Sequence, residues 1–226
     1  MKKLLLLLIM GINTISFSQE IDWDKADKIA LEQLTAGNVQ YAIYAFELVR
    51  GNGSISPDIH PLPYHDYYTS TDGAINSSYL KCRWGRTHHG VDLRTRGNKD
   101  NQLAVATCYG TVKVSSYKRG NCGGMILLDC DDGKQVQYCH MDFVIPADVI
   151  VGKKVPQGFP LGVTGGDNNE YEKNGNSGGP HLHYGIWDSY SKRISLNPHI
   201  LYPNLFPSKS GAQQPATIGD WNKCGK

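Results

Sequence analysis

The sequence has no apolar run long enough to cross a membrane as a helix, which needs about 20 residues. Its longest apolar run starts at Leu4, directly after Lys2 and Lys3, and ends at Met10. A charged start, a short apolar stretch and small residues before Gln19 are typical of a cleaved secretory signal rather than an uncleaved anchor. We therefore expect residues 1–18 to be a signal peptide and the mature protein to be secreted into the periplasm, the cell surface or the medium, without stable membrane insertion.

Charge of neither sign is in excess. The chain has 23 Lys and Arg against 21 Asp and Glu, and residues 1–18 contain two of the lysines and no acid. The mature chain is therefore balanced, and it has no basic block with interleaved aromatic residues. This composition argues against nucleic acid or an anionic membrane surface as the partner. About 208 residues remain after the signal, which suits one domain of ordinary size with appendages at its ends and a sizeable core. We expect a monomer.

No CxxC pair occurs, which disfavours a cysteine-based zinc site. Six cysteines in an exported chain instead favour disulfides, and six allow 15 pairings, so the connectivity stays open. Cys139 stands beside His140 and is a candidate catalytic thiol. Neighbouring strand residues point to opposite faces, however, and the even cysteine count favours bridging.

The fold class that we expect is mainly β, an antiparallel sheet or sandwich-like catalytic domain with a short, partly helical N-terminal extension. Short β-rich runs separated by glycine favour strands, and they cover residues 103–107, 110–116, 125–129 and 135–140. Asp-Gly at residues 132–133 predicts a tight hairpin turn between the last two. We place the extension at residues 19–54, the catalytic domain at 55–205 and a tail at 206–226.

One connection is long and lacks periodicity. Residues 164–180 are rich in glycine and asparagine and lead directly into His181 and His183. We interpret this segment as a substrate-facing loop, with a disordered surface insertion as the alternative. The sequence shows no internal repeat.

Three short motifs carry the candidate chemistry: His88-His89-Gly90-Val91-Asp92, Tyr138-Cys139-His140 and His181-Leu182-His183. Two imidazoles and one carboxylate form a ligand set that leaves zinc one open position for a reactive water, and two further histidines remain for proton transfer. No glutamate accompanies them as in HExxH enzymes. The pattern indicates a hydrolase.

Backbone geometry constrains how these residues meet. His181 and His183 share one face of a strand, about 6.6 Å apart. A straight strand would separate His88 from Asp92 by about 13 Å, so Gly90 is expected to mark a bend or bulge that lets both converge. Alternation turns His89 away from that face. We assign His89 a structural role, together with His60, His65 and His199.

These motifs resemble the lysostaphin-type (LytM-type) zinc endopeptidases, whose catalytic domain carries HxGxD, a later YxH and a terminal HxH in this order. The resemblance covers roughly residues 79–202. It implies that His88, Asp92 and His183 are ligands of one Zn²⁺ and that His140 and His181 act beside the bound water. It also implies hydrolysis of peptide cross-links in peptidoglycan.

The chain departs from the family where Asp167, Glu170, Glu172 and Lys173 lengthen and charge the loop before HxH. The cleaved bond is therefore open, and a secreted protease acting on glycine-rich proteins is a second hypothesis. A catalytically silent regulator of other cell-wall hydrolases is a third, which the five filled positions disfavour. Residues 19–54 are either an inhibitory pro-segment that masks the metal or a packing element or spacer.

Overall fold

The computed structural model describes residues 61–62, 75–77, 79–83, 86–95, 102–117, 120–142, 149–166, 175–207 and 217–218. The predicted signal peptide and the extension at 19–54 lie outside these residues, as do His60, His65 and the middle of the loop at 164–180. Among the described residues, no helix is long and apolar enough to span a membrane.

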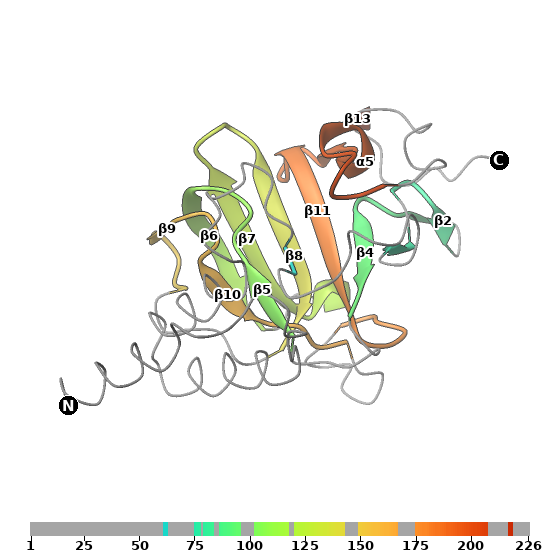
Figure 1. Cartoon of the computed structure of the whole chain (residues 1–226), viewed down its shortest axis with the longest axis horizontal. Coiled ribbons are helices and arrows are strands. Elements are labelled where there is room, and N and C mark those ends of the chain that lie inside the picture. Colours follow the sequence, from blue (N-terminus) through green and yellow to red (C-terminus); the bar gives the residue numbers. More distant parts are fainter. Residues whose placement is uncertain are drawn as a thin grey trace, which may run out of the picture.

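A nine-stranded antiparallel sheet forms the body of the domain (Figure 1). Seven strands follow one another across it in the order β1 (Ile75–Ser77), β4 (Val91–Arg94), β11 (His181–Ser189), β8 (Gln135–Met141), β7 (Gly124–Cys130), β6 (Gly110–Ser116) and β9 (Lys154–Val155). β12 (Ile194–Leu196) pairs with β11 and with β13 (Thr217–Ile218). The antiparallel β fold is thus confirmed.

Two small sheets and two short helical turns complete the described part. β5 (Leu103–Val105) pairs with β10 (Pro160–Val163), and β2 (Cys82–Arg83) pairs with β3 (Arg86–Thr87). A 3-10 turn, η3 (Gly120–Cys122), precedes β7, and α5 (Pro198–Leu201) follows β12. The predicted hairpin is present between β7 and β8, where Gly133 has φ 85° and donates its N–H to the Cys130 carbonyl at 3.0 Å.

The hydrophobic core lies against one face of the large sheet. Alternate residues of the central strands supply it, including Ile126 and Leu128 on β7 and Leu182, Tyr184 and Ile186 on β11. β5 and β10 lie over this face (Figure 1). Their side chains Ala104 and Leu161 are fully buried in the core. The intervening residues of β11, among them His181 and His183, therefore project from the opposite face.

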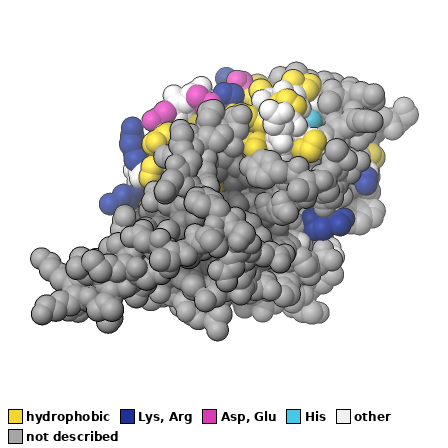
Figure 2. All heavy atoms as spheres, in the orientation of Figure 1, with side chains coloured by type: hydrophobic (Ala, Val, Ile, Leu, Met, Phe, Trp, Pro, Cys, Tyr) yellow, Lys and Arg dark blue, Asp and Glu magenta, His cyan; other side chains and the backbone are white. Residues whose placement is uncertain are grey.

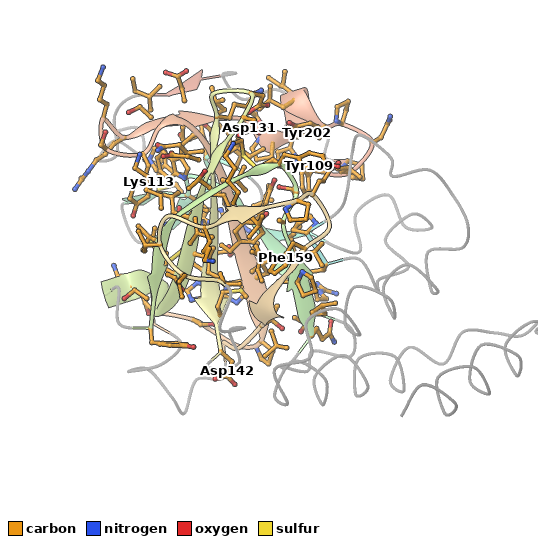
Figure 3. All side chains as sticks on the ribbon, turned by 90° about the vertical axis from the view of Figure 1, so that its left-hand side faces the viewer. Tyr109, Lys113, Asp131, Asp142, Phe159 and Tyr202 are labelled. Carbon is orange, nitrogen blue, oxygen red and sulfur yellow. A yellow bond between two sulfur atoms is a disulfide. The ribbon has the colours of Figure 1, made fainter. Side chains whose placement is uncertain are left out.

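The five described cysteines are all disulfide-bonded, as the even count predicts. Cys108 pairs with Cys130, and Cys122 pairs with Cys139. The two bonds lie at opposite ends of β7. Figure 3 shows this separation, with Tyr109 and Asp131, the neighbours of the first pair, at the end of the sheet far from Asp142, which follows His140 by two residues.

Charge is mixed on the surface. Both acidic and basic side chains appear among the coloured residues on the face in Figure 2, interspersed with apolar ones. The exposed pairs Lys113–Asp129 and Lys134–Asp132 are of this kind. Such a surface agrees with the balanced composition.

A buried polar network joins β12 and α5 to the segment before β2. The Ser195 hydroxyl lies 2.8 Å from the Tyr79 hydroxyl and 2.8 Å from His89 Nδ1. The Tyr79 N–H donates to His199 Nε2 at 3.3 Å, and His199 Nδ1 donates to the Phe206 carbonyl at 2.7 Å. Phe206, at the start of the predicted tail, packs in the core.

His199 makes the fold sensitive to acid. Burial and repulsion by His88 hold its pKa below 6.5, against the hydrogen bond to Phe206, which raises it. Below about pH 6.5 the unfolded chain binds a proton at His199 more readily than the folded chain does. The free energy of unfolding therefore decreases as the pH is lowered. In denaturant titrations from pH 8 to pH 5, His199→Gln should show a shallower fall than the wild type. An unchanged slope would contradict this role.

Candidate metal centre

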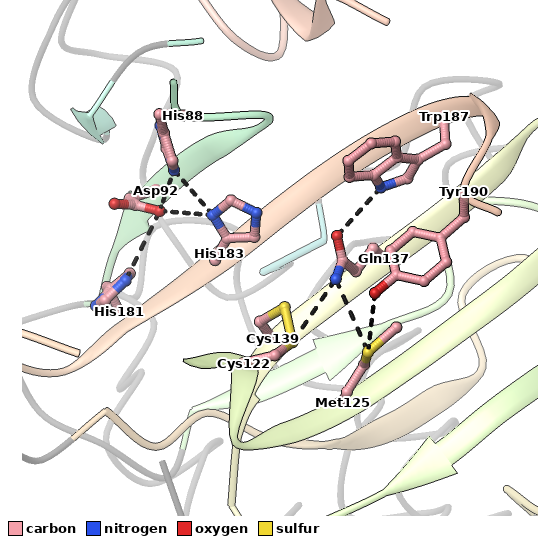
Figure 4. Close-up of a disulfide and its surroundings, with 10 residues drawn as sticks. All are labelled: His88, Asp92, Cys122, Met125, Gln137, Cys139, His181, His183, Trp187 and Tyr190. Carbon is pink, nitrogen blue, oxygen red and sulfur yellow. Dashed lines mark hydrogen bonds and ion pairs between the residues drawn. A yellow bond between two sulfur atoms is a disulfide. The ribbon is translucent and has the colours of Figure 1, made fainter. Parts of the chain in front are cut away.

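Two neighbouring strands and the turn before one of them bring the three predicted metal ligands together. Asp92 on β4 and His183 on β11 are direct cross-strand partners, so their side chains share a face. His88 precedes β4, and the bend at Gly90 turns it back over Asp92 (Figure 4). His88 Nε2 lies 2.9 Å from Asp92 Oδ1 and 2.9 Å from His183 Nδ1, and the last two atoms are 3.0 Å apart.

Gly90 permits this convergence by its size. A Cβ at this position would lie 2.6 Å from the Tyr184 carbonyl oxygen and 2.8 and 2.9 Å from His183 Cε1 and Nε2. Real Cβ atoms do not approach so closely. The His183 ring occupies the space that any side chain at residue 90 would need.

Gly90→Ala should therefore displace the His183 ring and lower zinc affinity by about 10- to 100-fold, the range seen when residues that support ligands are changed. Competition with a chromophoric chelator would measure it. Gly178→Ala is the matched control, because a Cβ there meets no atom within 4 Å. Equal affinities for the two variants would show that Gly90 does not hold the site open.

The group is buried and electrostatically prepared for a cation. Asp92 is only 2% exposed. Burial raises its pKa, but the charge of His88 and hydrogen bonds from His183 and His88 outweigh this and hold the pKa well below 3.8. Burial and repulsion by His88 lower the pKa of His183, although Asp92 opposes this. An ionised carboxylate and a neutral imidazole are the forms that bind metals.

The donor atoms fit zinc in number, type and spacing. Zinc with bonds of about 2.0–2.1 Å in a tetrahedron places its ligand atoms roughly 3.3 Å apart. The separations of 2.9, 2.9 and 3.0 Å form a slightly tighter triangle, which small side-chain shifts would open. His88, Asp92 and His183 are the residues that could hold a metal among those described. Three protein ligands leave the fourth position free, as in catalytic zinc sites.

His140 reaches the same face through a β-bulge. Gly124 and Met125 of β7 pair with Met141 and Cys139 of β8, so His140 is the extra residue between them. Its φ is 61°, in the left-handed region. The His140 ring lies 4.5 Å from the His181 ring and 6.3 Å from the His183 ring, measured between centroids.

The bulge overturns one sequence-based argument. Alternation predicts Cys139 and His140 on opposite faces. Cys139 pairs directly with His183 and shares its face. His140 joins that side because the extra residue breaks the period of two. Cys139 is nevertheless in a disulfide, as its assignment to bridging predicts.

Backbone contacts orient His181. Its Nδ1 lies 2.8 Å from the Gly179 carbonyl oxygen, which can only accept, so Nδ1 carries the proton. In the neutral ring the lone pair is then on Nε2, which lies 3.7 Å from Asp92 Oδ1. His181 therefore presents a proton acceptor to the ligand group.

Ser177 is a supporting residue that sequence reasoning missed. Its hydroxyl is 2.9 Å from the Gly166 carbonyl, 2.7 Å from the Gly179 carbonyl and 3.1 Å from His181 Nδ1. The hydroxyl joins both described ends of the loop at 164–180. A serine in a glycine-rich segment has no periodic signal that would single it out.

The remaining described histidines stand apart from this group. His89 stacks on Trp187, with ring centroids 5.9 Å apart, and contacts Ser195. His199 lies in the buried network with Tyr79. The structure thus places His88, Asp92, His140, His181 and His183 together and His89 and His199 elsewhere.

A family model described as Peptidase family M23 matches residues 86–198, half of the 226-residue chain. This segment contains all five residues of the site. No curated protein sequence matches the chain.

Several solved structures are similar to the chain. For the catalytic domain of the antimicrobial peptidase lysostaphin from Staphylococcus simulans, identity is 22%, the TM-score is 0.48, and the match covers 63% of this chain and 97% of that domain. For a zinc-containing peptidase from Vibrio cholerae, identity is 23% and the TM-score is 0.43, and the match covers 57% of this chain and 36% of that one. For the catalytic domain of the prophage-encoded M23 protein EnpA from Enterococcus faecalis, identity is 26% and the TM-score is 0.39, and the match covers 50% of this chain and 79% of that domain.

Proposed function

Because this chain belongs to peptidase family M23, we propose that it is a secreted zinc metalloendopeptidase that cleaves peptide cross-links of peptidoglycan. One observation carries the proposal. His88, Asp92 and His183 converge within 3.0 Å of one another beside two further histidines on the same face of the sheet.

In this proposal the three ligands hold one Zn²⁺. When bound, the ion supplies a Lewis acid that activates water and polarises the scissile carbonyl. Asp92 contributes the negative charge, and its burial excludes water that would compete for the cation. His88 and His183 contribute neutral nitrogens, so the site keeps a net positive charge that attracts a developing oxyanion.

His181 and His140 carry the proton in this proposal. Nε2 of His181 accepts a proton from the attacking water, because Nδ1 is already committed to Gly179. Protonated His181 then shares the site with His140, whose ring centroid is 4.5 Å away. A protonated imidazole of this pair donates to the oxyanion or to the leaving amine, which completes general acid–base catalysis.

The export assignment rests on residues 1–18 and on the disulfides. Five described cysteines are in disulfides, which persist in oxidising compartments. We propose secretion as a monomer that meets its peptide substrate outside the cytoplasm.

Digestion of purified peptidoglycans tests the substrate. One peptidoglycan is cross-linked through glycine bridges and the other directly from D-alanine to diaminopimelate, with a glycine-rich protein as the third substrate. Mass spectrometry should show new amino termini in at least one peptidoglycan, and Asp92→Ala should produce none. Cleavage of the protein alone would favour the secreted-protease hypothesis. No cleavage by zinc-loaded protein would favour the silent regulator and contradict the proposal.

A further inference from the structure

We propose that the Cys122–Cys139 disulfide positions the His140–His181 pair, so that hydrolysis, but not zinc binding, depends on this bond. The predicted effect on hydrolysis rests on the proposed peptidase function. The bulge at His140, the contacts of η3 and the loop that leads to His181 connect this disulfide to the two histidines.

His140 has a strained backbone. It is a non-glycine residue in the left-handed region, φ 61°, and it is the extra residue of the β-bulge between β7 and β8. Such a conformation is unfavourable and persists only where the surroundings enforce it. Two restraints flank it. Cys139, the preceding residue, is bonded to Cys122, and the His140 carbonyl accepts the Gly165 N–H at 2.7 Å.

The other half of the disulfide, Cys122, lies where the loop before His181 contacts η3. Cys122 ends η3, and the neighbouring Asn121 carbonyl accepts the Asn176 N–H at 2.9 Å. Gly175 approaches so closely that a Cβ would collide with the Asn121 carbonyl oxygen and lie 2.5 Å from the Gly123 nitrogen. The final part of the loop before His181 therefore docks on the turn that the disulfide secures.

These contacts form a closed circuit around the two histidines. From Asn176 the chain passes to Ser177, whose hydroxyl contacts the Gly166 carbonyl and His181 Nδ1. Gly165, beside Gly166, returns to the His140 carbonyl. The disulfide is the only covalent cross-connection that the described residues show in this circuit. Breaking this bond removes a restraint from Cys139, the neighbour of the strained His140. It also removes a restraint from η3, which the loop contacts.

The ligand residues are anchored differently. Asp92 and His183 are paired with each other across β4 and β11, and His88 is held over them by the bend at Gly90. Loss of the disulfide therefore disturbs the proton carriers more than the metal ligands. This difference separates positioning from general stabilisation.

The second disulfide supplies a matched control. Cys108–Cys130 spans 22 residues and Cys122–Cys139 spans 17, so the two constrain the unfolded chain to a similar degree. Cys130 ends β7 and Gly124, next to the η3 turn, begins it, which separates them by roughly 20 Å along the strand. Cys108–Cys130 therefore lies at the end of β7 away from η3, which the loop before His181 contacts.

The experiment compares Cys122→Ser/Cys139→Ser with Cys108→Ser/Cys130→Ser in the full chain. For each variant we would measure bound zinc, the melting temperature, and kcat and KM on a cross-linked peptide that the wild type cleaves. We would also measure amide exchange of Asn176 and Gly165. The first variant should keep one zinc, lose at least tenfold in kcat and exchange both amides faster. The control should melt lower by a similar amount, with kcat within about twofold of wild type and unchanged exchange at these amides.

Equal losses of kcat in the two variants would overturn the proposal, because the disulfide would then act through stability alone. Wild-type kcat and amide exchange in the first variant would also overturn it. If that variant does not fold, Gly175→Ala tests the same docking with the disulfide intact and should reduce kcat and Asn176 protection together. Wild-type values there would refute the docking. A wild type that hydrolyses no peptide would contradict the proposed function, while the exchange data would still decide the positioning.

Discussion

His181→Ala is expected to lower the rate of peptide hydrolysis by about 10²- to 10⁴-fold while one zinc remains bound, the range for loss of a general acid–base group. The reason is geometric. His181 Nε2 faces the ligand group at 3.7 Å from Asp92, but it is not among the three atoms that lie within 3.0 Å of one another. Removing it deletes a proton acceptor and leaves the ligands in place. Steady-state kinetics and metal analysis of the same preparation would measure both quantities.

His140→Ala should behave in the same way, because its ring is the neighbour of His181 at 4.5 Å. His199→Gln is the control, since His199 lies in the buried network with Tyr79 and Phe206 rather than in the site. It should retain both zinc and activity at pH 8. Full activity in His181→Ala and His140→Ala would refute the role given to the pair, and loss of zinc in either would move that residue into the ligand set.

Asp92→Asn is expected to weaken zinc binding by more than about 10²-fold, which exceeds the usual effect of changing a residue behind a ligand. The substitution keeps the shape of the side chain and removes the only carboxylate of the group. Two imidazoles, lying 2.9 Å apart at their ligand nitrogens, would then share a buried site with no negative charge to balance the cation. Chelator competition at pH 7.5 would report the affinity.

The folded state must be checked separately. Asp92 also accepts hydrogen bonds within the group, and an amide can maintain some of them. The metal-free Asp92→Asn protein should therefore melt cooperatively. When zinc is added at concentrations that saturate the wild type, this variant should show no detectable hydrolysis. Unchanged zinc affinity in a folded variant would contradict the assignment of Asp92 as a ligand.

Much of the strand framework follows from local pattern. Residues 110–116 were expected as a strand and form β6 with the same bounds, because β-branched residues there sit between glycine and polar turn residues. The Asp132-Gly133 turn could also be predicted, since glycine accepts the positive φ of 85° that the hairpin requires. These are short-range effects that a few neighbouring residues determine.

The site was predictable where spacing alone limits geometry. His88 and Asp92 are four positions apart, and the glycine between them indicates a bend. Why glycine is required was not visible, because the colliding atoms belong to His183 and Tyr184, more than ninety residues away. The bend is a local feature, but the requirement for glycine comes from tertiary contacts with His183 and Tyr184.

The bulge at His140 was beyond sequence reasoning for a similar reason. It arises from the register between β7 and β8, where Gly124 faces Met141 and Met125 faces Cys139. Nothing in the order Tyr138-Cys139-His140 reveals that the alternation breaks after Cys139. The support from Ser177 likewise depends on carbonyls that the loop brings together only in the folded chain.

The central claim is that hydrolysis depends on a metal held by His88, Asp92 and His183. Its most direct test is a titration of zinc into chelator-stripped protein, with bound metal and peptide cleavage measured in each sample. We predict no cleavage before addition, a linear rise with bound zinc and a break at one ion per chain. Full cleavage by the stripped protein, or the same titration curve from Asp92→Ala, would contradict the account.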